Sequence, residues 1–358
     1  MTRSVITVEA ERSYDVVIGS SWQGEFLPLV SDRSRCAVIT TQTLKDSLGD
    51  FGLGDLESGD CEFIYCVIPD GEEGKSPQVL LNLWNWLAAA GLTRSDLVVG
   101  IGGGAVTDIA GFVAATYLRG VDWIAIPTSV AGAVDAAIGG KTGANLDYGK
   151  NLIGSFHSPI KVIIDLAWFT TLSDRDFAAG LAEVVKCGFI RDAKILDLLK
   201  NQTLASVRSN ASLVEELVTR AVAVKASVVG SDFKEGFERE ILNYGHTFGH
   251  AVESHSRYSL RHGECVAIGM AFMAHLQLSL GLISSDIHAL HFEILSGIGL
   301  PTQYQGGDWL EMKAIMSRDK KARGHALRFV TITELGVTDR LTDVAQDVLV
   351  ATYEKVCP

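Results

Sequence analysis

The amino-acid sequence predicts an α/β domain with a mainly parallel sheet, followed by a mostly α-helical domain. Short runs rich in apolar and β-branched residues recur through the first half and alternate with stretches of helical spacing, which is the pattern of βαβ units. From about residue 173, apolar residues recur at intervals of three and four, which is typical of helices. A chain of 358 residues with 47% hydrophobic content can fill two cores, so we expect domains over residues 1–172 and 173–358.

The elements follow from these runs in chain order. In the first domain, β-rich runs predict strands over residues 14–19, 36–40, 62–68, 96–102, 122–127 and 161–166. Helical spacing between them predicts helices over 77–90 and 105–118. In the second domain, the same spacing predicts helices over 177–190, 212–229, 246–256, 264–281 and 285–298, and only the run RFVTIT at 328–333 has the pattern of a strand.

Composition excludes several classes of protein. The net charge of −12 argues against a general nucleic-acid binder, which needs a surplus of Lys and Arg. The start, MTRSVITVEAERSYD, builds no apolar core of a secretion signal, and the most apolar region, 97–140, contains charged residues that disfavour a membrane span. The six cysteines form no CxxC pair, as expected for reduced thiols. We expect a cytoplasmic protein without a membrane or nucleic-acid partner.

Two glycine-rich runs have the composition of phosphate-binding segments. In DLVVGIGGGAVTDIAGFVAA, glycines join a strand to a helix, where backbone N–H groups and the helix dipole favour an anion. Asp108 follows one turn later and could cap the turn or accept hydrogen bonds from ligand hydroxyls. The run VDAAIGGKTGANLDYGKN at 134–151 sets lysines on flexible glycine turns, which suits a phosphate. For the first run, the alternative is a tight turn that binds no ligand. For the second run, the alternative is a solvated loop.

Histidines cluster in ILNYGHTFGHAVESHSRYSLRHGE at 241–264, which contains four of the nine in the chain. His246 and His250 are four residues apart and would share one helix face, while Gly263 is interpreted as a turn just after His262. A catalytic zinc site commonly uses three protein ligands and leaves one position open. There is no HExxH pattern here, so a metal site would need a third ligand from elsewhere in the chain.

These runs together resemble the 3-dehydroquinate synthase family of sugar phosphate cyclases. The matching runs are PDGEEGKS at 69–76, GGGAVTDIAGFVAATYLRG at 102–120, PTS at 127–129, VDAAIGGKTGAN at 134–145, GKN at 149–151, GLAEVVKCGFI at 180–190, REILNYGHTFGHA at 239–251, RHGE at 261–264 and RDKK at 318–321. The resemblance covers essentially the whole chain. Members commonly have PTT where this chain has Ser129, a change that keeps the hydroxyl.

The resemblance implies a metal site, an NAD site and a substrate site. The metal, Zn²⁺ or Co²⁺, is expected at Glu183, His246 and His262, with His255 as an ordinary surface histidine. The implied NAD contacts are Asp70, Gly71, Glu72, Lys75, Gly103, Gly104, Ala105, Asp108, Thr128, Ser129, Lys141, Lys150, Thr170 and Thr171. The implied substrate contacts are Asp135, Lys141, Asn151, Lys186, Lys225, Arg239, Asn243, His250 and Lys320, the last preferred over Lys321.

The implied reaction belongs to the shikimate pathway of aromatic biosynthesis. It converts 3-deoxy-D-arabino-heptulosonate 7-phosphate to 3-dehydroquinate and phosphate, by transient oxidation, phosphate elimination, re-reduction and aldol closure. The lysines and arginine among the substrate contacts give an acidic protein the local positive field that a phosphorylated sugar acid needs. Because these contacts fall in both predicted domains, we expect closure on the substrate, and the family implies a homodimer.

The sequence leaves three rival interpretations of the function open. A metal-dependent polyol dehydrogenase of the glycerol dehydrogenase type shares a GGG turn and a metal in a helical domain, but the basic cluster argues against it. Another sugar phosphate cyclase, producing an inosose or a valiolone, is disfavoured by Asn243 and His250. A catalytically inactive homologue kept for binding is disfavoured by the intact metal and basic positions.

Overall fold

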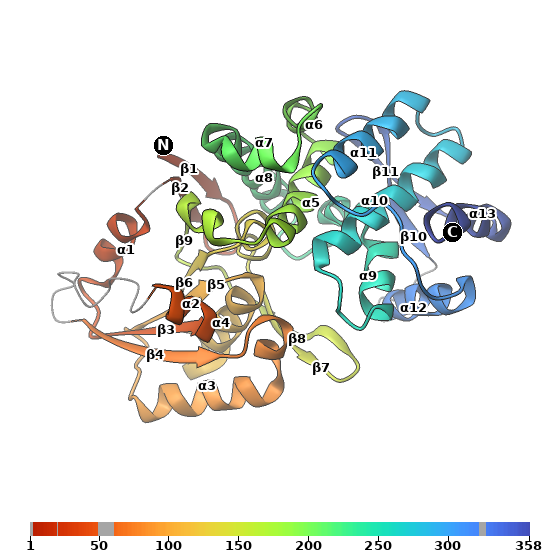
Figure 1. The fold of residues 1–358 in the computed structure, drawn as a ribbon. Coiled ribbons are helices and arrows are strands. Elements are labelled where there is room, and N and C mark those ends of the chain that lie inside the picture. The colour runs from red at the N-terminus through yellow and green to blue at the C-terminus, as the bar shows by residue number, and fades with distance from the viewer. Residues whose placement is uncertain (1–2, 20, 49–60, 322–326) are drawn as a thin grey trace. The chain divides into compact units, whose positions relative to one another are not determined.

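The structure, a computed structural model, describes residues 3–19, 21–48, 61–321 and 327–358, without the side chains of Leu48 and 318–321. The chain forms two compact units. The first unit consists of Met1–Thr171 and Lys225–Lys234, and the second of Leu172–Val224 and Glu235–Pro358. Figure 1 labels the helices and strands of both units. No helix among the described residues is long and apolar enough to cross a membrane.

The first unit is built on a seven-stranded sheet with the order β1-β2-β9-β6-β5-β3-β4. Its strands are β1 (Ser4–Val8), β2 (Tyr14–Gly19), β3 (Arg35–Thr41), β4 (Glu62–Ile68), β5 (Leu97–Gly102), β6 (Asp122–Pro127) and β9 (Lys161–Asp165). Only the pairing of β1 with β2 is antiparallel, and the other pairs are parallel. All residues of β5 are buried, as expected for a central parallel strand covered on both faces. The predicted parallel sheet is therefore confirmed.

Helices cover this sheet, and short helical turns follow several strands (Figure 1). They are α1 (Trp22–Val30), α2 (Gln42–Leu48), η2 (Gly71–Lys75), α3 (Pro77–Ala89), α4 (Gly104–Thr116), η3 (Tyr117–Arg119), the π-helical turn η4 (Gly132–Ala136) and η5 (Leu166–Thr171). Helix α3 begins at Pro77, where the missing N–H costs nothing, and the Ser76 hydroxyl accepts a hydrogen bond from Val79 N at 3.3 Å. The sequence predicted α3 and α4 to within a few residues.

The second glycine-rich run forms a β-hairpin from Lys141 onward, while Gly139 and Gly140 before it have positive φ, so the interpretation of its lysines as lying on flexible glycine turns was wrong. Strands β7 (Lys141–Leu146) and β8 (Gly149–Phe156) pair antiparallel. A Cβ on Gly143 would lie 2.7 Å from the Ile153 carbonyl oxygen, so this glycine allows the two backbones to approach closely. The run therefore presents Lys141, Lys150 and Asn151 from paired strands.

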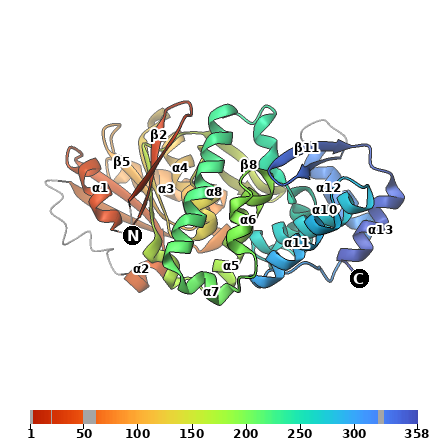
Figure 2. The same cartoon turned by 90° about the horizontal axis from the view of Figure 1, so that it is seen from above.

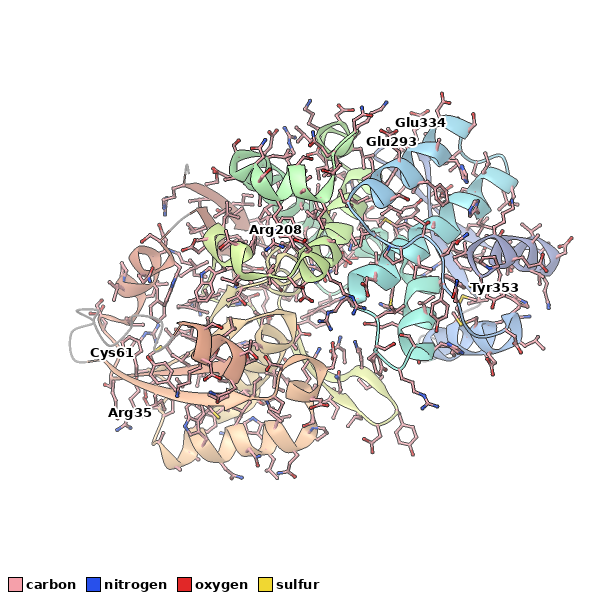
Figure 3. All side chains as sticks on the ribbon, viewed as in Figure 1. Arg35, Cys61, Arg208, Glu293, Glu334 and Tyr353 are labelled. Atoms are coloured by element: carbon pink, nitrogen blue, oxygen red, sulfur yellow. The ribbon has the colours of Figure 1, made fainter. Side chains whose placement is uncertain are left out.

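The second unit is mostly helical, as predicted. Its helices are α5 (Asp174–Ile190), α6 (Lys194–Leu199), α7 (Leu204–Ser209), most of α8 (Ala211–Ser231), η6 (Glu238–Asn243), α9 (His246–His255), α10 (His262–Ser279), α11 (Ser285–Gly297), α12 (Trp309–Lys321) and α13 (Gln346–Val356). Helix α10 is buried on all sides because α5, α9, α11 and α13 pack around it (Figures 1 and 2). The Arg208 side chain, labelled in Figure 3, joins α7 to the start of α5 by donating to Asp174 Oδ1 at 2.8 Å.

The expectation of a single strand in this unit was wrong. Strand β10 (Arg328–Glu334) pairs antiparallel with β11 (Val337–Thr342). The sequence VTDRLT of β11 has no fully buried residue, and so it lacks the apolar alternation by which a half-buried strand is recognised.

Residues Lys225–Lys234, at the end of α8 and just beyond it, belong to the first unit. The Phe233 ring lies 5.4 Å from the Phe156 ring, measured between centroids. Lys225 Nζ donates a hydrogen bond to Asp135 Oδ1 at 2.5 Å. This segment lies beyond residue 172 but belongs to the first unit, so a single boundary near residue 172 does not separate the two units.

Candidate active site

Three helices of the second unit bring together a carboxylate and two imidazoles. The ligand atoms of Glu183 on α5, His246 on α9 and His262 on α10 all lie within 4.8 Å of one another. Glu183 Oε1 is 3.5 Å from His246 Nε2 and 3.4 Å from His262 Nε2. One carboxylate and two imidazoles form a donor set of the kind used by catalytic zinc, so these residues fit a divalent metal.

The ring of His246 is held in the orientation that a metal ligand requires. Its Nδ1 lies 3.1 Å from the Tyr244 carbonyl oxygen, which can only accept, so Nδ1 carries the proton. Burial, together with the nearby positive charge of Lys186, lowers the pKa of His246 to about 3. The imidazole is therefore neutral, and its Nε2 lone pair faces Glu183.

The pKa of His262 is shifted in the opposite direction from that of His246. Burial lowers the pKa of His262, but the nearby carboxylates of Glu183 and Glu253 outweigh this effect and raise the pKa to about 10. Metal binding at Nε2 would have to replace a proton there, as is general for histidine ligands.

The buried Lys186 fixes the Glu183 carboxylate. Lys186 Nζ donates to Glu183 Oε2, and the two side chains are 2% and 1% exposed. Because Lys186 occupies Oε2, Oε1 is the oxygen that faces the two imidazoles. Lys186 was predicted as a substrate contact, and the structure adds this second role.

Glycines let the three helices that carry Glu183, His246 and His262 approach closely. A Cβ on Gly263 would overlap the Ala179 carbonyl of α5, and one on Gly249 of α9 would lie 2.8 Å from the Cys265 carbonyl oxygen of α10. Gly263 lies in the first turn of α10, so its interpretation as a turn after His262 was wrong. Its small size serves helix packing, which brings His262 toward Glu183.

His250 and His255 differ in their relation to this cluster. The His250 ring centroid lies 5.2 Å from that of His246, because the two residues share one face of α9 as predicted. His255 is half-buried rather than an ordinary surface residue, and its Nδ1 lies 2.6 Å from the Tyr304 hydroxyl. Glu253, which the sequence analysis missed, forms a second group with His250 and His262.

Of the residues predicted to contact NAD, Lys141 and Lys150 lie on the β7–β8 hairpin, and the others follow the carboxyl ends of parallel strands in the first unit. They follow β4 (Asp70, Gly71, Glu72, Lys75), β5 (Gly103, Gly104, Ala105, Asp108), β6 (Thr128, Ser129) and β9 (Thr170, Thr171). In the sheet, β4 lies on one side of β3 and β5 lies on the other. The direction in which successive strands are added therefore reverses between β3 and β5. Ligands of open α/β sheets bind at the carboxyl edge beside such a switch point.

The glycine-rich turn after β5 is shaped by close packing and leads into a helix N-terminus. A Cβ on Gly100 would lie 2.8 Å from the Ala110 Cβ, so the strand and helix α4 could not approach as they do. Gly103 is the N-cap of α4 and offers no side chain to the first N–H groups. Such a terminus suits the phosphates of a dinucleotide.

A polar cluster ties this edge of the sheet to the β7–β8 hairpin. Lys75 Nζ donates to Asp108 Oδ2 and to Asn151 Oδ1, both at 2.5 Å. Asp108 therefore pairs with a lysine and does not cap its turn. Glu72 Oε1 lies 3.0 Å from Lys150 Nζ.

Asn145, which the sequence analysis missed, connects the same elements. Its Nδ2 donates to Glu72 Oε2 at 2.7 Å, and its Oδ1 accepts from Asn151 N at 3.0 Å. Asn151 has a φ of 53°, a left-handed conformation that asparagine tolerates. The one available signal was its place at the end of the matched VDAAIGGKTGAN run.

The predicted substrate contacts divide between the units. Asp135, Lys141, Asn151 and Lys225 belong to the first unit, and Lys186, Arg239, Asn243 and His250 to the second. Arg239 is only 2% exposed, whereas Lys141 is exposed at the start of β7. Asn243 Nδ2 donates to Glu235 Oε1 at 3.3 Å. The side chain of Lys320 lies outside the described residues.

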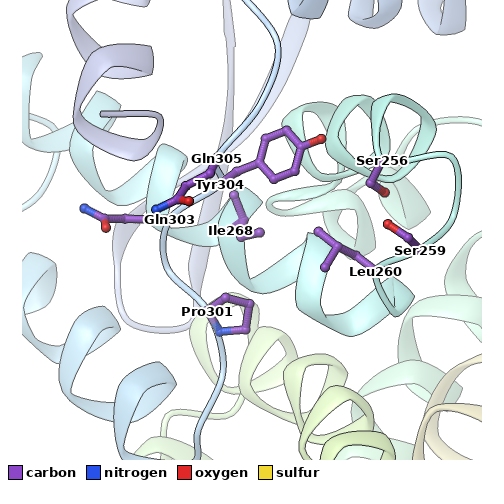
Figure 4. Close-up of a pocket in the computed structure, with 8 residues that line it drawn as sticks. All are labelled: Ser256, Ser259, Leu260, Ile268, Pro301, Gln303, Tyr304 and Gln305. Carbon is purple, nitrogen blue, oxygen red and sulfur yellow. The ribbon is translucent and has the colours of Figure 1, made fainter.

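A pocket of about 330 Å³ lies elsewhere in the second unit (Figure 4). It is lined by Ser256, Ser259, Leu260, Ile268, Pro301, Gln303, Tyr304 and Gln305. None of these lining residues is charged, so the pocket does not suit a phosphorylated sugar acid.

Comparison with known proteins gives the same family over nearly the whole chain. The family model described as 3-dehydroquinate synthase N-terminal matches residues 65–179, and the one described as 3-dehydroquinate synthase C-terminal matches residues 180–322. The chain is 45% identical to the 3-dehydroquinate synthase of Pseudarthrobacter chlorophenolicus, over 97% of this chain and 96% of that protein. It is also 45% identical to that of Streptomyces coelicolor, over 96% of this chain and 94% of that protein.

Solved structures share the fold. ValA, the 2-epi-5-epi-valiolone synthase of Streptomyces hygroscopicus with NAD⁺ and Zn²⁺ bound, is 28% identical with a TM-score of 0.89 over 98% of each chain. A 2-deoxy-scyllo-inosose synthase complexed with carbaglucose-6-phosphate, NAD⁺ and Co²⁺ is 23% identical with a TM-score of 0.88, over 99% of this chain and 100% of that one. A probable glycerol dehydrogenase of Sinorhizobium meliloti, 15% identical over 99% of this chain and 98% of that one, has a lower TM-score of 0.62. By both family models and these full-length identities, the chain belongs to the 3-dehydroquinate synthase family.

Proposed function

We propose that the protein converts 3-deoxy-D-arabino-heptulosonate 7-phosphate to 3-dehydroquinate and phosphate, as a carbon–oxygen lyase. The observation that carries this proposal is the cluster of Glu183, His246 and His262, found in a chain 45% identical to curated 3-dehydroquinate synthases. An inactive homologue kept only for binding would have no need of an ordered donor set. The shikimate pathway is the biosynthetic context of this reaction.

The protein would use NAD and one divalent metal. NAD would supply a reversible hydride acceptor, and Zn²⁺ or Co²⁺ would polarise a substrate oxygen. Residues at the carboxyl edge of the sheet would hold NAD, with Lys75 fixed by Asp108 and Asn151. The metal would be held by Glu183, His246 and His262. The NAD⁺ with Zn²⁺ or Co²⁺ bound to the valiolone and inosose synthases supports this assignment.

The basic side chains would bind the anionic groups of the substrate. Arg239 is buried, and its planar guanidinium can make paired hydrogen bonds to a carboxylate or phosphate. Lys225 is held by Asp135 and keeps an ammonium charge at a defined position. These charges give the substrate a positive environment despite a net charge of −12. A polyol dehydrogenase would not require them.

Phosphate release tests the proposal most directly. Purified protein with Zn²⁺ or Co²⁺, substoichiometric NAD⁺ and the heptulosonate phosphate should release phosphate over many turnovers without net accumulation of NADH. Release should stop after chelation and return when the metal is restored. Stoichiometric NADH with a simple polyol, without phosphate release, would instead identify a dehydrogenase. Turnover of another sugar phosphate alone would identify a different cyclase.

We further propose that the protein is a cytoplasmic homodimer. We expect the homodimer implied by the family, and sedimentation equilibrium of the purified protein would measure its mass. A cytoplasmic location, expected from the sequence, can be tested by cell fractionation.

A further inference from the structure

Glu253 is a buried carboxylate beside the three proposed metal ligands. It lies on α9, three residues after His250 and seven after His246, so all three share one face of the helix. Its side chain is 7% exposed, and its Oε1 lies 3.5 Å from His262 Nδ1. A carboxylate this deeply buried needs a proton donor, and a ring nitrogen of His262 is placed beside it.

The two nitrogens of His262 have different neighbours. Nε2 lies 3.4 Å from Glu183 Oε1, in the position of a metal-ligating atom. Nδ1 is the nitrogen left to carry the ring proton, and it faces Glu253. His246 shows the same arrangement, with the Tyr244 carbonyl as the acceptor at Nδ1. Ligating histidines generally donate their second N–H to a carboxylate or a carbonyl in this way.

The ring of His262 needs such a partner more than the ring of His246 does. The His262 side chain is 35% exposed, against 10% for His246, so surrounding atoms restrict it less. The backbone at His262 is already fixed, because Arg261 N donates to Glu264 Oε2 at 2.8 Å and Arg175 binds the same carboxylate. These contacts do not set the rotation of the imidazole ring, whereas a contact at Nδ1 sets it.

We infer that Glu253 is a positioning residue that accepts the Nδ1 proton of His262 and thereby turns Nε2 toward the metal. The inference rests on the proposed metal site. The present distance of 3.5 Å is long for a hydrogen bond, and a small rotation of the ring would shorten it. Glu253 is not assigned to the metal itself, because Glu183 already supplies the carboxylate that faces both imidazoles.

Zn²⁺ affinity is the first test, measured by competition with a chromogenic chelator in the absence of substrate and NAD⁺. Glu253→Ala should raise the Kd for Zn²⁺ by about 10–100-fold, the usual cost of losing such a partner. Glu253→Gln should raise it less, because the amide oxygen still accepts a hydrogen bond. Glu240→Gln is the matched control, because Glu240 is a buried carboxylate of the same unit that accepts from Arg328 at 2.8 Å.

The imidazole tautomer is the second test, since a purely structural role would not change it. In ¹⁵N spectra of the Zn²⁺-loaded protein, His262 should carry its proton on Nδ1, and Glu253→Gln should weaken the hydrogen-bond shift of this nitrogen but not that of His246. A Zn²⁺ Kd within twofold of wild type in Glu253→Ala, or an equal loss in Glu240→Gln, would overturn the inference. So would an unchanged ¹⁵N shift for His262. These readouts involve no turnover, so failure of the proposed reaction would be seen separately.

Discussion

Tyr244 connects a proposed metal ligand to a buried polar network. Its carbonyl accepts from His246, while its hydroxyl donates to His291 Nε2 at 2.8 Å and accepts from Gln277 Nε2 at 3.0 Å. His291 Nδ1 donates to the Ile287 carbonyl at 2.8 Å, which fixes the ring tautomer. Because the donors and acceptors match, the network holds the backbone that orients His246.

His246→Ala should abolish most metal binding and most activity. Two ligands hold a divalent ion far more weakly than three, so the loss should exceed the roughly 10–100-fold cost of losing an outer-shell partner. His255→Ala is the control, because His255 contacts Tyr304 and lies outside the ligand group. Metal content by atomic emission after dialysis measures the difference. Full occupancy in His246→Ala would contradict the assignment.

His291 should make the protein less stable in acid. Burial lowers the pKa of His291 from 6.5 to about 3. Between those values the unfolded chain binds a proton that the folded chain does not, so the free energy of unfolding falls as pH is lowered from about 6.5 to 3. One such group contributes at most about 1.4 kcal/mol per pH unit.

Urea unfolding at several pH values in this window measures that slope. His246, with its own depressed pKa, contributes in the same direction, so the wild-type slope should exceed that of a single group. His291→Gln should be less stable at neutral pH, since the Tyr244 hydroxyl loses its partner, but its slope should be shallower. Parallel curves for the two proteins would show that His291 titrates normally.

At the scale of elements, the packing of α10 on α5 depends on Gly263. Gly263→Ala would force the two helices apart, because the new methyl group would meet the Ala179 carbonyl. We expect a loss of stability of about 1–3 kcal/mol from overpacking, and weaker Zn²⁺ binding because His262 moves away from Glu183. Thermal unfolding and chelator competition measure the two effects.

Gly230→Ala, in helix α8, is the matched control for Gly263→Ala. A Cβ there would lie 3.4 Å from the Glu9 carbonyl oxygen, an ordinary contact. Alanine favours a helix over glycine by about 0.5–1 kcal/mol, so this variant should be as stable as wild type or more so. If Gly263→Ala behaves like Gly230→Ala, the close approach of α5 and α10 does not depend on the glycine.

Sequence pattern predicted the elements that have a clear apolar signal. Helices α3, α4 and α11 lie close to ranges predicted from helical spacing, and strand β5, buried along its whole length, lies close to a range predicted from its β-rich run. Helix α10 begins at His262, ahead of the predicted 264, because its start is marked by a capping interaction of Arg261 and Glu264 rather than by apolar residues. The β7–β8 hairpin was missed because glycine, lysine and asparagine dominate its composition.

The candidate site was only partly predictable. Spacing alone placed His246 and His250 on one helix face, but the third ligand, Glu183, comes from a different helix, and only the resemblance to a family supplied it. Asn145 was missed because its role depends on a contact with Glu72, which is distant in sequence, and Glu253 because its contact with His262 joins two different helices. Local periodicity carries no information about such contacts.

At the scale of the whole molecule, the two proposed ligands belong to different units. The metal ligands all lie in the second unit, and the residues expected to contact NAD all lie in the first. Zn²⁺ should therefore slow hydrogen exchange in α5, α9 and α10, and NAD⁺ should slow it in η2, the start of α4 and the β7–β8 hairpin. A ligand at 100 times its Kd stabilises its unit by about 2.7 kcal/mol.

Hydrogen exchange with mass spectrometry, with each ligand added alone, makes this comparison. Mg²⁺ in place of Zn²⁺ is a control, since it prefers oxygen ligands in octahedral geometry. Protection by Zn²⁺ in the first unit, with none in α5, α9 and α10, would contradict the proposed metal site.

The segment Lys225–Lys234 also limits how such a protein can be recombined with a relative. A chimaera with one crossover near residue 172 would inherit its sheet from one parent and this segment from the other. The foreign segment would have to supply an ammonium for Asp135 and an aromatic ring for Phe156. Viable exchanges should therefore need three junctions, near 172, 225 and 234, so that each parent's segment travels with its own sheet.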